Sequence, residues 1–138
     1  MGGRTLAVRA VLLLCAAALI FAGVRRHEGH DACNGARDDA LAIVLKKAPA
    51  TDAPAVARRI SADCRDVGVL AEGAVALLRV DQVGAAGTLA TTAVRRAPDA
   101  RNSWLALSLV RRKAGDAAGA QRALARARQL DPVGLSRS

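Results

Sequence analysis

The side chains of this chain that are best suited to chemistry gather in the segment RRHEGHDAC, residues 25–33. A zinc-protease helix needs two His four residues apart, with a Glu between them that holds a water. Here His27 and His30 are three residues apart, and the intervening Gly29 disfavours a helix. A metal site built from His27, His30 and Cys33 is the alternative to a hydrated spacer. Because no fourth ligand is evident, we predict the spacer, with no metal and no cofactor.

Elsewhere the reactive residue types form no catalytic set. The Ser residues have no His near them in sequence, because both His lie in the segment just described. Gly84, Gly87 and Gly115 form no phosphate-binding pattern and are typical of turns and close packing. We therefore expect that the protein is not an enzyme.

Upstream, the nineteen residues 6–24 read LAVRAVLLLCAAALIFAGV, with Arg9 as their only charge. A helix of that length spans roughly 28 Å, close to the hydrocarbon thickness of a bilayer. We predict that residues 1–24 are a single-pass membrane anchor. The alternative is a cleaved signal peptide, with the Ala run at 16–18 as a cleavage candidate, which would leave a secreted soluble module. Either interpretation places the bulk of the chain outside the cytoplasm.

The rest of the chain has the composition of packed helices. Ala, Leu and Val dominate an apolar content of 52%, and the only aromatic residues are Phe21 and Trp104. After a spacer at 25–34, the apolar periodicity predicts six helices. Their expected positions are 35–47, 53–63, 67–80, 84–96, 100–113 and 117–130. Asp99 and Asp116 are expected to cap the last two, and Gly115 suits a helix end.

The second half of the chain repeats itself with a period of 34 residues. Pro98 and Pro132 are separated by this interval, and so are Ala93 and Ala127. A fixed period of this length is typical of stacked helical hairpins.

At residues 101–134 the sequence resembles the tetratricopeptide repeat family. The residues that carry the resemblance are Trp104, Leu107, Ser108, Gly115, Asp116, Ala120, Leu124, Ala127 and Pro132. Arg111 departs from the family, which usually has an aromatic residue there, and the unit 67–100 matches less well, with Gly73 in place of a Leu. The resemblance implies an all-α fold, an α-solenoid of three hairpins over residues 35–134, followed by a tail at 135–138. It also implies one core shared by Trp104, Leu107, Leu124 and Ala127.

Cys33 and Cys64 flank the first predicted hairpin. If the helices 35–47 and 53–63 are antiparallel, the start of one lies beside the end of the other, which brings the two Cys within bonding reach. We predict a disulfide, which an extracytoplasmic compartment would preserve. Two free thiols are the alternative, and Cys15 is left over within the apolar segment.

Basic side chains outnumber acidic ones by 21 to 12, for a net charge of +9. Most of them fall near predicted helix C-termini, where the helix dipole favours cations. Nucleic-acid binding would need stacking aromatics as well, and Trp104 is the only one outside the anchor, so we predict no nucleic-acid partner. The excess is uneven: residues 84–138 hold 10 basic and 3 acidic side chains, whereas residues 27–83 hold 7 and 9.

The tetratricopeptide resemblance implies a groove, lined by first-helix residues, that holds another protein. Carried onto this sequence, the groove positions are Arg79, Asn102, Leu105, Leu109, Arg112 and Lys113. The basic residues suit an anionic partner, and the leucines supply apolar contact. We therefore predict a membrane-tethered adaptor that mediates protein–protein interaction in the cell envelope. The alternatives are a metal- or haem-handling protein that uses His27, His30 and Cys33, a secreted repeat module, and a basic face that contacts anionic lipid headgroups.

Overall fold

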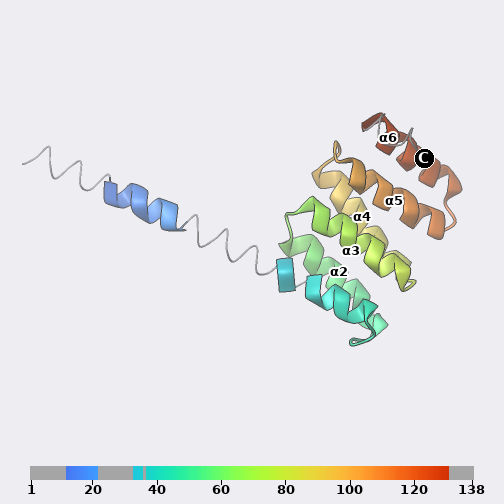
Figure 1. The fold of residues 1–138 in the computed structure, drawn as a ribbon, viewed down its shortest axis with the longest axis horizontal. Helices are drawn as coiled ribbons and strands as arrows, with labels where there is room; N and C mark the ends of the chain where they lie inside the picture. Colours follow the sequence, from blue (N-terminus) through green and yellow to red (C-terminus); the bar gives the residue numbers. More distant parts are fainter. Residues whose placement is uncertain (1–11, 22–32, 36, 131–138) are drawn as a thin grey trace, which may run out of the picture. The chain divides into compact units, whose positions relative to one another are not determined.

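The computed structural model describes residues 12–21, 33–35 and 37–130, and all regular secondary structure within these ranges is helical (Figure 1). The chain divides into two compact units, Met1–Asp31 and Ala32–Ser138. In the first unit, residues 12–21 form a helix whose large apolar side chains are exposed. Among the helices in the described part of the chain, none is both long and apolar enough to cross a bilayer.

Several sequence predictions fall outside the described residues. These are the two ends of the predicted anchor, the spacer at 25–32 with its two His, and the tail at 135–138.

The second unit consists of helices joined by short connections. A helical stretch at 33–35 and 37–44 comes first. It is followed by a 3-10 turn, η1 (Ala50–Asp52), and by α2 (Ala53–Asp63), α3 (Val67–Arg79), α4 (Val83–Arg96), α5 (Arg101–Lys113) and α6 (Ala117–Leu130). The five predicted helices from residue 53 onward agree with α2 to α6 to within one residue at each end. The all-helical fold is therefore confirmed for the described residues.

The first helix, residues 37–44, ends earlier than the predicted 47 because the chain turns sharply there. Lys46 has a positive φ of 57°. The N–H of Lys47 donates to the carbonyl oxygen of Ala42 at 2.7 Å, and that of Lys46 donates to Ile43 at 3.0 Å. These two bonds satisfy the last carbonyls of the helix in a Schellman-type end.

The same helix end recurs in each hairpin. Asp81 follows α3 with a φ of 61°, and Gly115 follows α5 with a φ of 84°. After α3, the N–H of Gln82 donates to Leu77; after α5, that of Asp116 donates to Arg111. The backbone therefore has a left-handed residue after the first helix of each hairpin, and only in the last hairpin is that residue the favoured glycine.

The 34-residue period of the sequence is a period of the backbone as well. α5 begins and ends 34 residues after α3 (101 − 67 and 113 − 79), and α6 does the same relative to α4 (117 − 83 and 130 − 96). Each first helix therefore presents equivalent positions to its neighbours at this interval.

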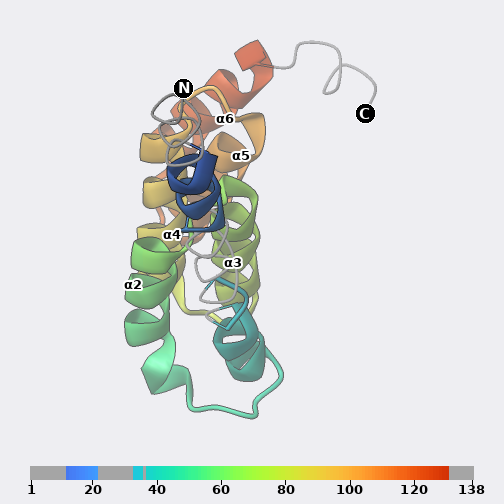
Figure 2. The same cartoon turned by 90° about the vertical axis from the view of Figure 1, so that its left-hand side faces the viewer.

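The helices pack in two layers through small side chains (Figures 1 and 2). α3 packs against α4 and α5, α4 against α2 and α5, and α5 against α6. The largest fully buried side chains include Ile60, Leu70, Leu77 and Leu89. Burying one such side chain stabilises the fold by roughly 1.5–3 kcal/mol. At Gly73 an added Cβ would come 3.0 Å from Cδ1 of Leu89, so the Leu of the adjacent helix fills the space that a side chain at 73 would need.

The caps agree with the sequence predictions only in part. Oδ1 of Asp116 accepts from the N–H of Gly119 at 2.8 Å, so the predicted cap of α6 is present. Asp99 is not the cap of α5: Ala100 holds that position and makes no side-chain cap bond. The helix begins one residue later than the Pro98–Asp99 pattern indicates. Asp66 caps α3 by accepting from the N–H of Gly68, an interaction the sequence analysis missed.

Trp104 is not a fully buried core residue. It is half-buried against the core, and its Nε1 donates to the carbonyl oxygen of Pro98 at 2.8 Å. Leu107 and Ala127 are buried, while Leu124 is only half-buried. The expectation of one core shared by all four residues is therefore wrong. Leu107 belongs to the main core and Trp104 packs at its edge, where its N–H reaches a backbone acceptor, whereas Ala127 is buried outside that core.

Candidate functional site

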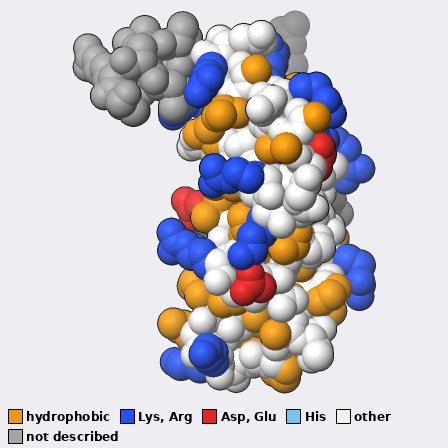
Figure 3. All heavy atoms as spheres, turned by 90° about the vertical axis from the view of Figure 1, so that its right-hand side faces the viewer, with side chains coloured by type: hydrophobic (Ala, Val, Ile, Leu, Met, Phe, Trp, Pro, Cys, Tyr) orange, Lys and Arg blue, Asp and Glu red, His pale blue; other side chains and the backbone are white. Residues whose placement is uncertain are grey.

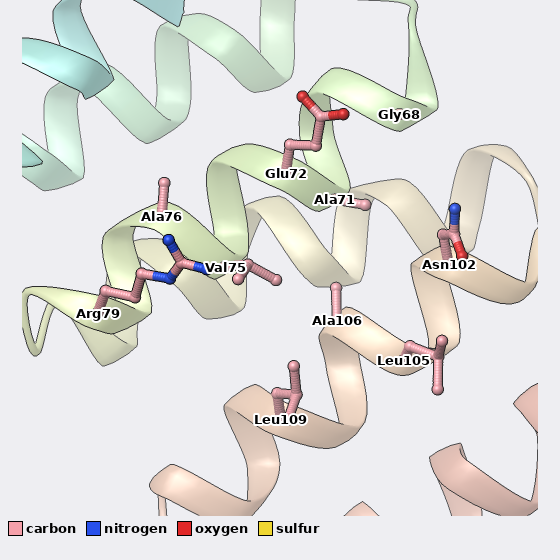
Figure 4. A pocket seen from close by; sticks show the side chains of 10 residues that line it. All are labelled: Gly68, Ala71, Glu72, Val75, Ala76, Arg79, Asn102, Leu105, Ala106 and Leu109. Carbon is pink, nitrogen blue, oxygen red and sulfur yellow. The ribbon is translucent and has the colours of Figure 1, made fainter. Parts of the chain in front are cut away.

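A groove of about 430 Å³ runs between α3 and α5, the first helices of the last two hairpins (Figure 4). It is lined by Gly68, Ala71, Glu72, Val75, Ala76, Arg79, Asn102, Leu105, Ala106 and Leu109. Because α5 repeats α3 at 34 residues, equivalent faces of the two helices lie side by side and form its two walls.

The structure brings four of the six predicted partner-binding residues together in this groove. Arg79, Asn102, Leu105 and Leu109 all line it. Arg112 instead lines a separate hollow of about 190 Å³ between α5 and α6.

Lys113, the last of the six predicted residues, is held elsewhere. Its Nζ lies 2.7 Å from Oδ1 of Asp81, at the turn after α3. This ion pair crosses from one hairpin to the next and could not be seen in a single helix. Lys113 is therefore an inter-repeat contact in this structure and does not line the groove.

The inner surface of the groove is mainly apolar. Val75, Ala76, Leu105 and Leu109 are half-buried, and Ala106 is buried between them. Half-buried leucines keep apolar area in contact with water, and covering that area on binding is favourable at about 25 cal/mol per Å². This surface is suited to apolar side chains of a partner.

The polar residues of the groove lie at its edges (Figure 4). Asn102 is near the N-terminus of α5, Glu72 lies near the middle of α3, and Arg79 is the last residue of α3. Oε2 of Glu72 lies 3.7 Å from the guanidinium of Arg37. Among the described residues no carboxylate pairs with Arg79, so this edge carries an uncompensated positive charge.

The positive charge is not confined to the groove. Figure 3 shows Lys and Arg side chains interspersed with apolar ones over the face at the α6 end, with fewer acidic side chains. The last turns of α4 and α5 hold Arg95 and Arg96 and then Arg111, Arg112 and Lys113, as the dipole argument predicts. Arg96 also joins two helices, because its guanidinium donates to the carbonyl oxygens of Ser61 and Cys64 at the end of α2.

Apart from Arg79, the sequence analysis missed the residues that α3 contributes to the groove. Gly68, Ala71 and Val75 stand 34 residues before Asn102, Leu105 and Leu109. The signal was therefore available: the period itself assigns each groove residue of α5 a counterpart in α3. The weaker match of that unit to the family concealed it.

Cys33 and Cys64 form a disulfide, as the hairpin argument predicts. Their Cα atoms are 4.6 Å apart, and both residues are buried. Cys64 follows the last residue of α2, and Cys33 stands in the helical stretch that leads into the first helix. The bond therefore joins the two ends of the first hairpin that lie beside each other, and Cys15 is a free, exposed cysteine.

The disulfide also bears on the metal hypothesis. A cysteine binds a metal as its thiolate, whereas the sulfur of Cys33 is bonded to that of Cys64. His27 and His30 lie outside the described residues. Within the ranges that are described, no three His, Cys, Asp or Glu residues are grouped as a metal site requires.

Comparison of the chain with protein-family models, with curated proteins and with solved structures finds no match in any of the three.

Proposed function

We propose that the chain is a membrane-tethered adaptor with a tetratricopeptide-like repeat domain, whose groove between α3 and α5 binds a segment of another protein. The observation that carries this proposal is the groove itself, with half-buried Leu105 and Leu109 inside it. At its edge stands Arg79, which has no ion pair within the part of the chain that the structure describes. The segment it suits has apolar side chains and carries negative charge.

The proposal is one of binding, without catalysis. The ionisable side chains that line the groove are Glu72 and Arg79. They stand seven residues apart on one helix, and Glu72 faces Arg37. Such a pair lacks the adjacent nucleophile and base on which covalent or acid–base catalysis depends.

For location, we propose an anchor within residues 6–24 and a repeat domain outside the cytoplasm. The disulfide supports this placement, because such bonds persist in oxidising compartments and are rare in the cytosol. A secreted module released from a signal peptide differs only in whether the mature protein begins at Met1 or beyond the Ala run at 16–18. Sequencing the amino terminus of the mature protein separates the two.

Recovery of partners from membranes tests the proposed groove. The tagged full-length chain is crosslinked in membranes, purified, and its partners are quantified by mass spectrometry. Arg79→Glu is expected to lower partner recovery about tenfold, because it places a like charge against an anionic segment. The reversal is made at Arg79 since Arg112 lines another hollow and Lys113 is already paired.

Arg126→Glu is the matched control, because Arg126 is exposed on α6 and lines none of these hollows. An equal loss of partner recovery in the two variants would mean that binding depends on the overall positive charge of the surface, as contact with lipid headgroups does, and not on the groove. Unchanged recovery in both would show that no partner depends on the groove.

A further inference from the structure

The hollow of about 190 Å³ between α5 and α6 lies at the end of the stack of hairpins, since no helix follows α6 among the described residues. It is lined by Ser108, Arg112, Ala117, Ala120, Gln121 and Leu124. Figure 3 shows apolar side chains between basic ones at this end. Leu124 is only half-buried here, so the hollow keeps apolar surface in contact with water.

The hairpin before it shows what covers these positions when the stack continues. One side of α6 carries Gln121, Leu124 and Arg128, and the residues of α4 that stand 34 positions earlier are Gly87, Ala90 and Val94. A Cβ added at Gly87 would lie 3.7 Å from Cγ1 of Val110 in α5, and Ala90 is fully buried. α5 therefore covers this side of α4, whereas no helix of the described ranges covers the matching side of α6.

The start of the stack carries the other half of such a contact. In α5, Ala106 and Val110 face the preceding hairpin and are 2% and 5% exposed. Two periods earlier, Asp38 and Ala42 hold the same positions of the first helix (106 − 68 and 110 − 68), where they are exposed and half-buried. No hairpin precedes this helix within the described part of its unit. The stack therefore begins with a face of the kind that would cover its own end in another copy.

The charges at one end of these two faces are opposite. Helices joined by a short connection run antiparallel, so the first turn of α5 lies beside the last turn of α4. A first helix seated on α6 in the same way would bring Asp38 beside Arg128, in the last turn of α6. Both residues are exposed, and neither has an ion pair within the ranges that the structure describes. The contact would therefore join two complementary charges.

An exposed apolar side chain lies at the other end of the first helix. Leu45 follows this helix directly and is 61% exposed. Its counterpart two periods later, Lys113, reaches the turn of the preceding hairpin, where its Nζ lies 2.7 Å from Oδ1 of Asp81. Seated in that geometry, Leu45 would reach the turn at Gly115 of another copy and lose contact with water, which is favourable.

We propose that the hollow between α5 and α6 receives the first helix of a second copy of this chain, with Asp38 of one copy beside Arg128 of the other. The contact repeats between copies the stacking that joins hairpins within one copy. Its two faces differ, so the copies stack head to tail, and each copy has one neighbour at each end. None of these residues lines the groove between α3 and α5, so the inference goes beyond the proposed function and is tested separately.

Energy transfer between differently labelled copies measures this association. Full-length oxidised chains, labelled at the amino terminus with a donor or an acceptor dye, are mixed in a large excess of detergent micelles. The net charge of +9 repels one copy from another, so the salt concentration is kept at about 0.15 M or above, where that repulsion is screened. We expect energy transfer that rises with protein concentration and then saturates.

Charge reversal at either end should weaken the association. Asp38→Arg and Arg128→Asp are each expected to raise the dissociation constant about tenfold, because each places like charges together. An equimolar mixture of the two variants should associate as tightly as the natural chain, since each variant keeps the charge that the other needs. Arg126→Asp is the matched control, because Arg126 is exposed on another side of α6, and this variant should associate as the natural chain does.

Four results would overturn the proposal, each in its own way. If the natural chain shows no energy transfer but a chain that ends at Leu130 does, residues 131–138 of the same copy occupy the hollow; no transfer from either means that copies do not associate. If the mixture of variants stays dissociated, the contact does not join these two ends. Equal weakening by Arg126→Asp would mean that association depends on overall charge. Transfer that no variant alters would place the association elsewhere, as in the apolar segment at 6–24.

Discussion

The hydroxyl of Ser103 lies fully buried in α5 and has no hydrogen-bond partner among the described residues. A buried polar group without a partner costs about 1–3 kcal/mol. Ser103→Ala removes this group and leaves almost no cavity, so we expect the free energy of unfolding to rise by about 1 kcal/mol, measured by urea denaturation.

Ser108→Ala is the matched control for that substitution. Ser108 lies on the same helix, but its Oγ donates to the carbonyl oxygen of Leu105 at 2.8 Å. We expect no gain from this variant. A lower free energy of unfolding in Ser103→Ala would contradict this, because it would mean that the hydroxyl of Ser103 makes a stabilising hydrogen bond.

Lys46 takes a backbone conformation that favours glycine. Its φ of 57° lies in the left-handed region, where Gly115 stands in the last hairpin. Lys46→Gly should therefore raise the free energy of unfolding by roughly 0.5–1 kcal/mol, while Gly115→Ala should lower it by a similar amount. Thermal unfolding of both variants checks this. If Lys46→Gly destabilised the protein, the repeated helix end would be absent from the first hairpin.

Single residues show what the sequence can and cannot reveal. Gly115 was predicted correctly as a helix end and Asp116 as a helix cap, because glycine favours the one position and aspartate the other. The prediction that Asp99 caps α5 was wrong, because the residue pattern does not locate a helix start to within one residue. The pairing of Lys113 with Asp81 could not be predicted from either helix alone, since it depends on how α5 stacks on α3.

At the scale of elements, the helices were predictable and their depths of burial were less so. Apolar periodicity and turn residues located α2 to α6, because both signals are local. The half-burial of Trp104 and Leu124 depends on the neighbours that each helix meets, which the period does not specify. Four residues of the groove were predicted because the resemblance to the tetratricopeptide repeat indicates which face of a first helix lines it.

The disulfide is the element-scale feature with the largest expected effect on stability. It closes a loop with a sequence separation of 31 residues, between the two ends of the first hairpin. Closing a loop of this size is worth about 3–4 kcal/mol in the chain-entropy model. A Cys33→Ser/Cys64→Ser variant should lose roughly 2–4 kcal/mol of unfolding free energy, measured by denaturation under non-reducing conditions.

Mass spectrometry of non-reduced peptides from the natural chain accompanies this comparison. The Cys33 and Cys64 peptides should be recovered joined. Recovery of both as free thiols from an oxidising compartment would contradict the hairpin geometry, and unchanged stability in the double variant would mean that the bond closes an already ordered structure.

At the scale of the whole molecule, charge is distributed unevenly between the two halves. Residues 84–138 carry a net charge of +7, while residues 27–83 carry −2. Helix dipoles account for basic residues at helix ends, but they do not account for the scarcity of acids in the later half. An anionic partner in the groove between α3 and α5 would meet the basic half of the chain at the α5 wall. It would also meet Arg79 of α3, which pairs with no carboxylate among the described residues.

The central claim is that a partner protein sits in the groove between α3 and α5, and site-specific photo-crosslinking tests it most directly. A photo-reactive amino acid replaces Asn102, which is exposed and lines the groove, or Ala125, which is exposed on α6 and does not. Both full-length chains are irradiated in membranes and separated by mass. A partner in the groove should give a discrete crosslinked protein from position 102 that is absent from position 125. The same adducts from both positions, or none from position 102, would contradict it.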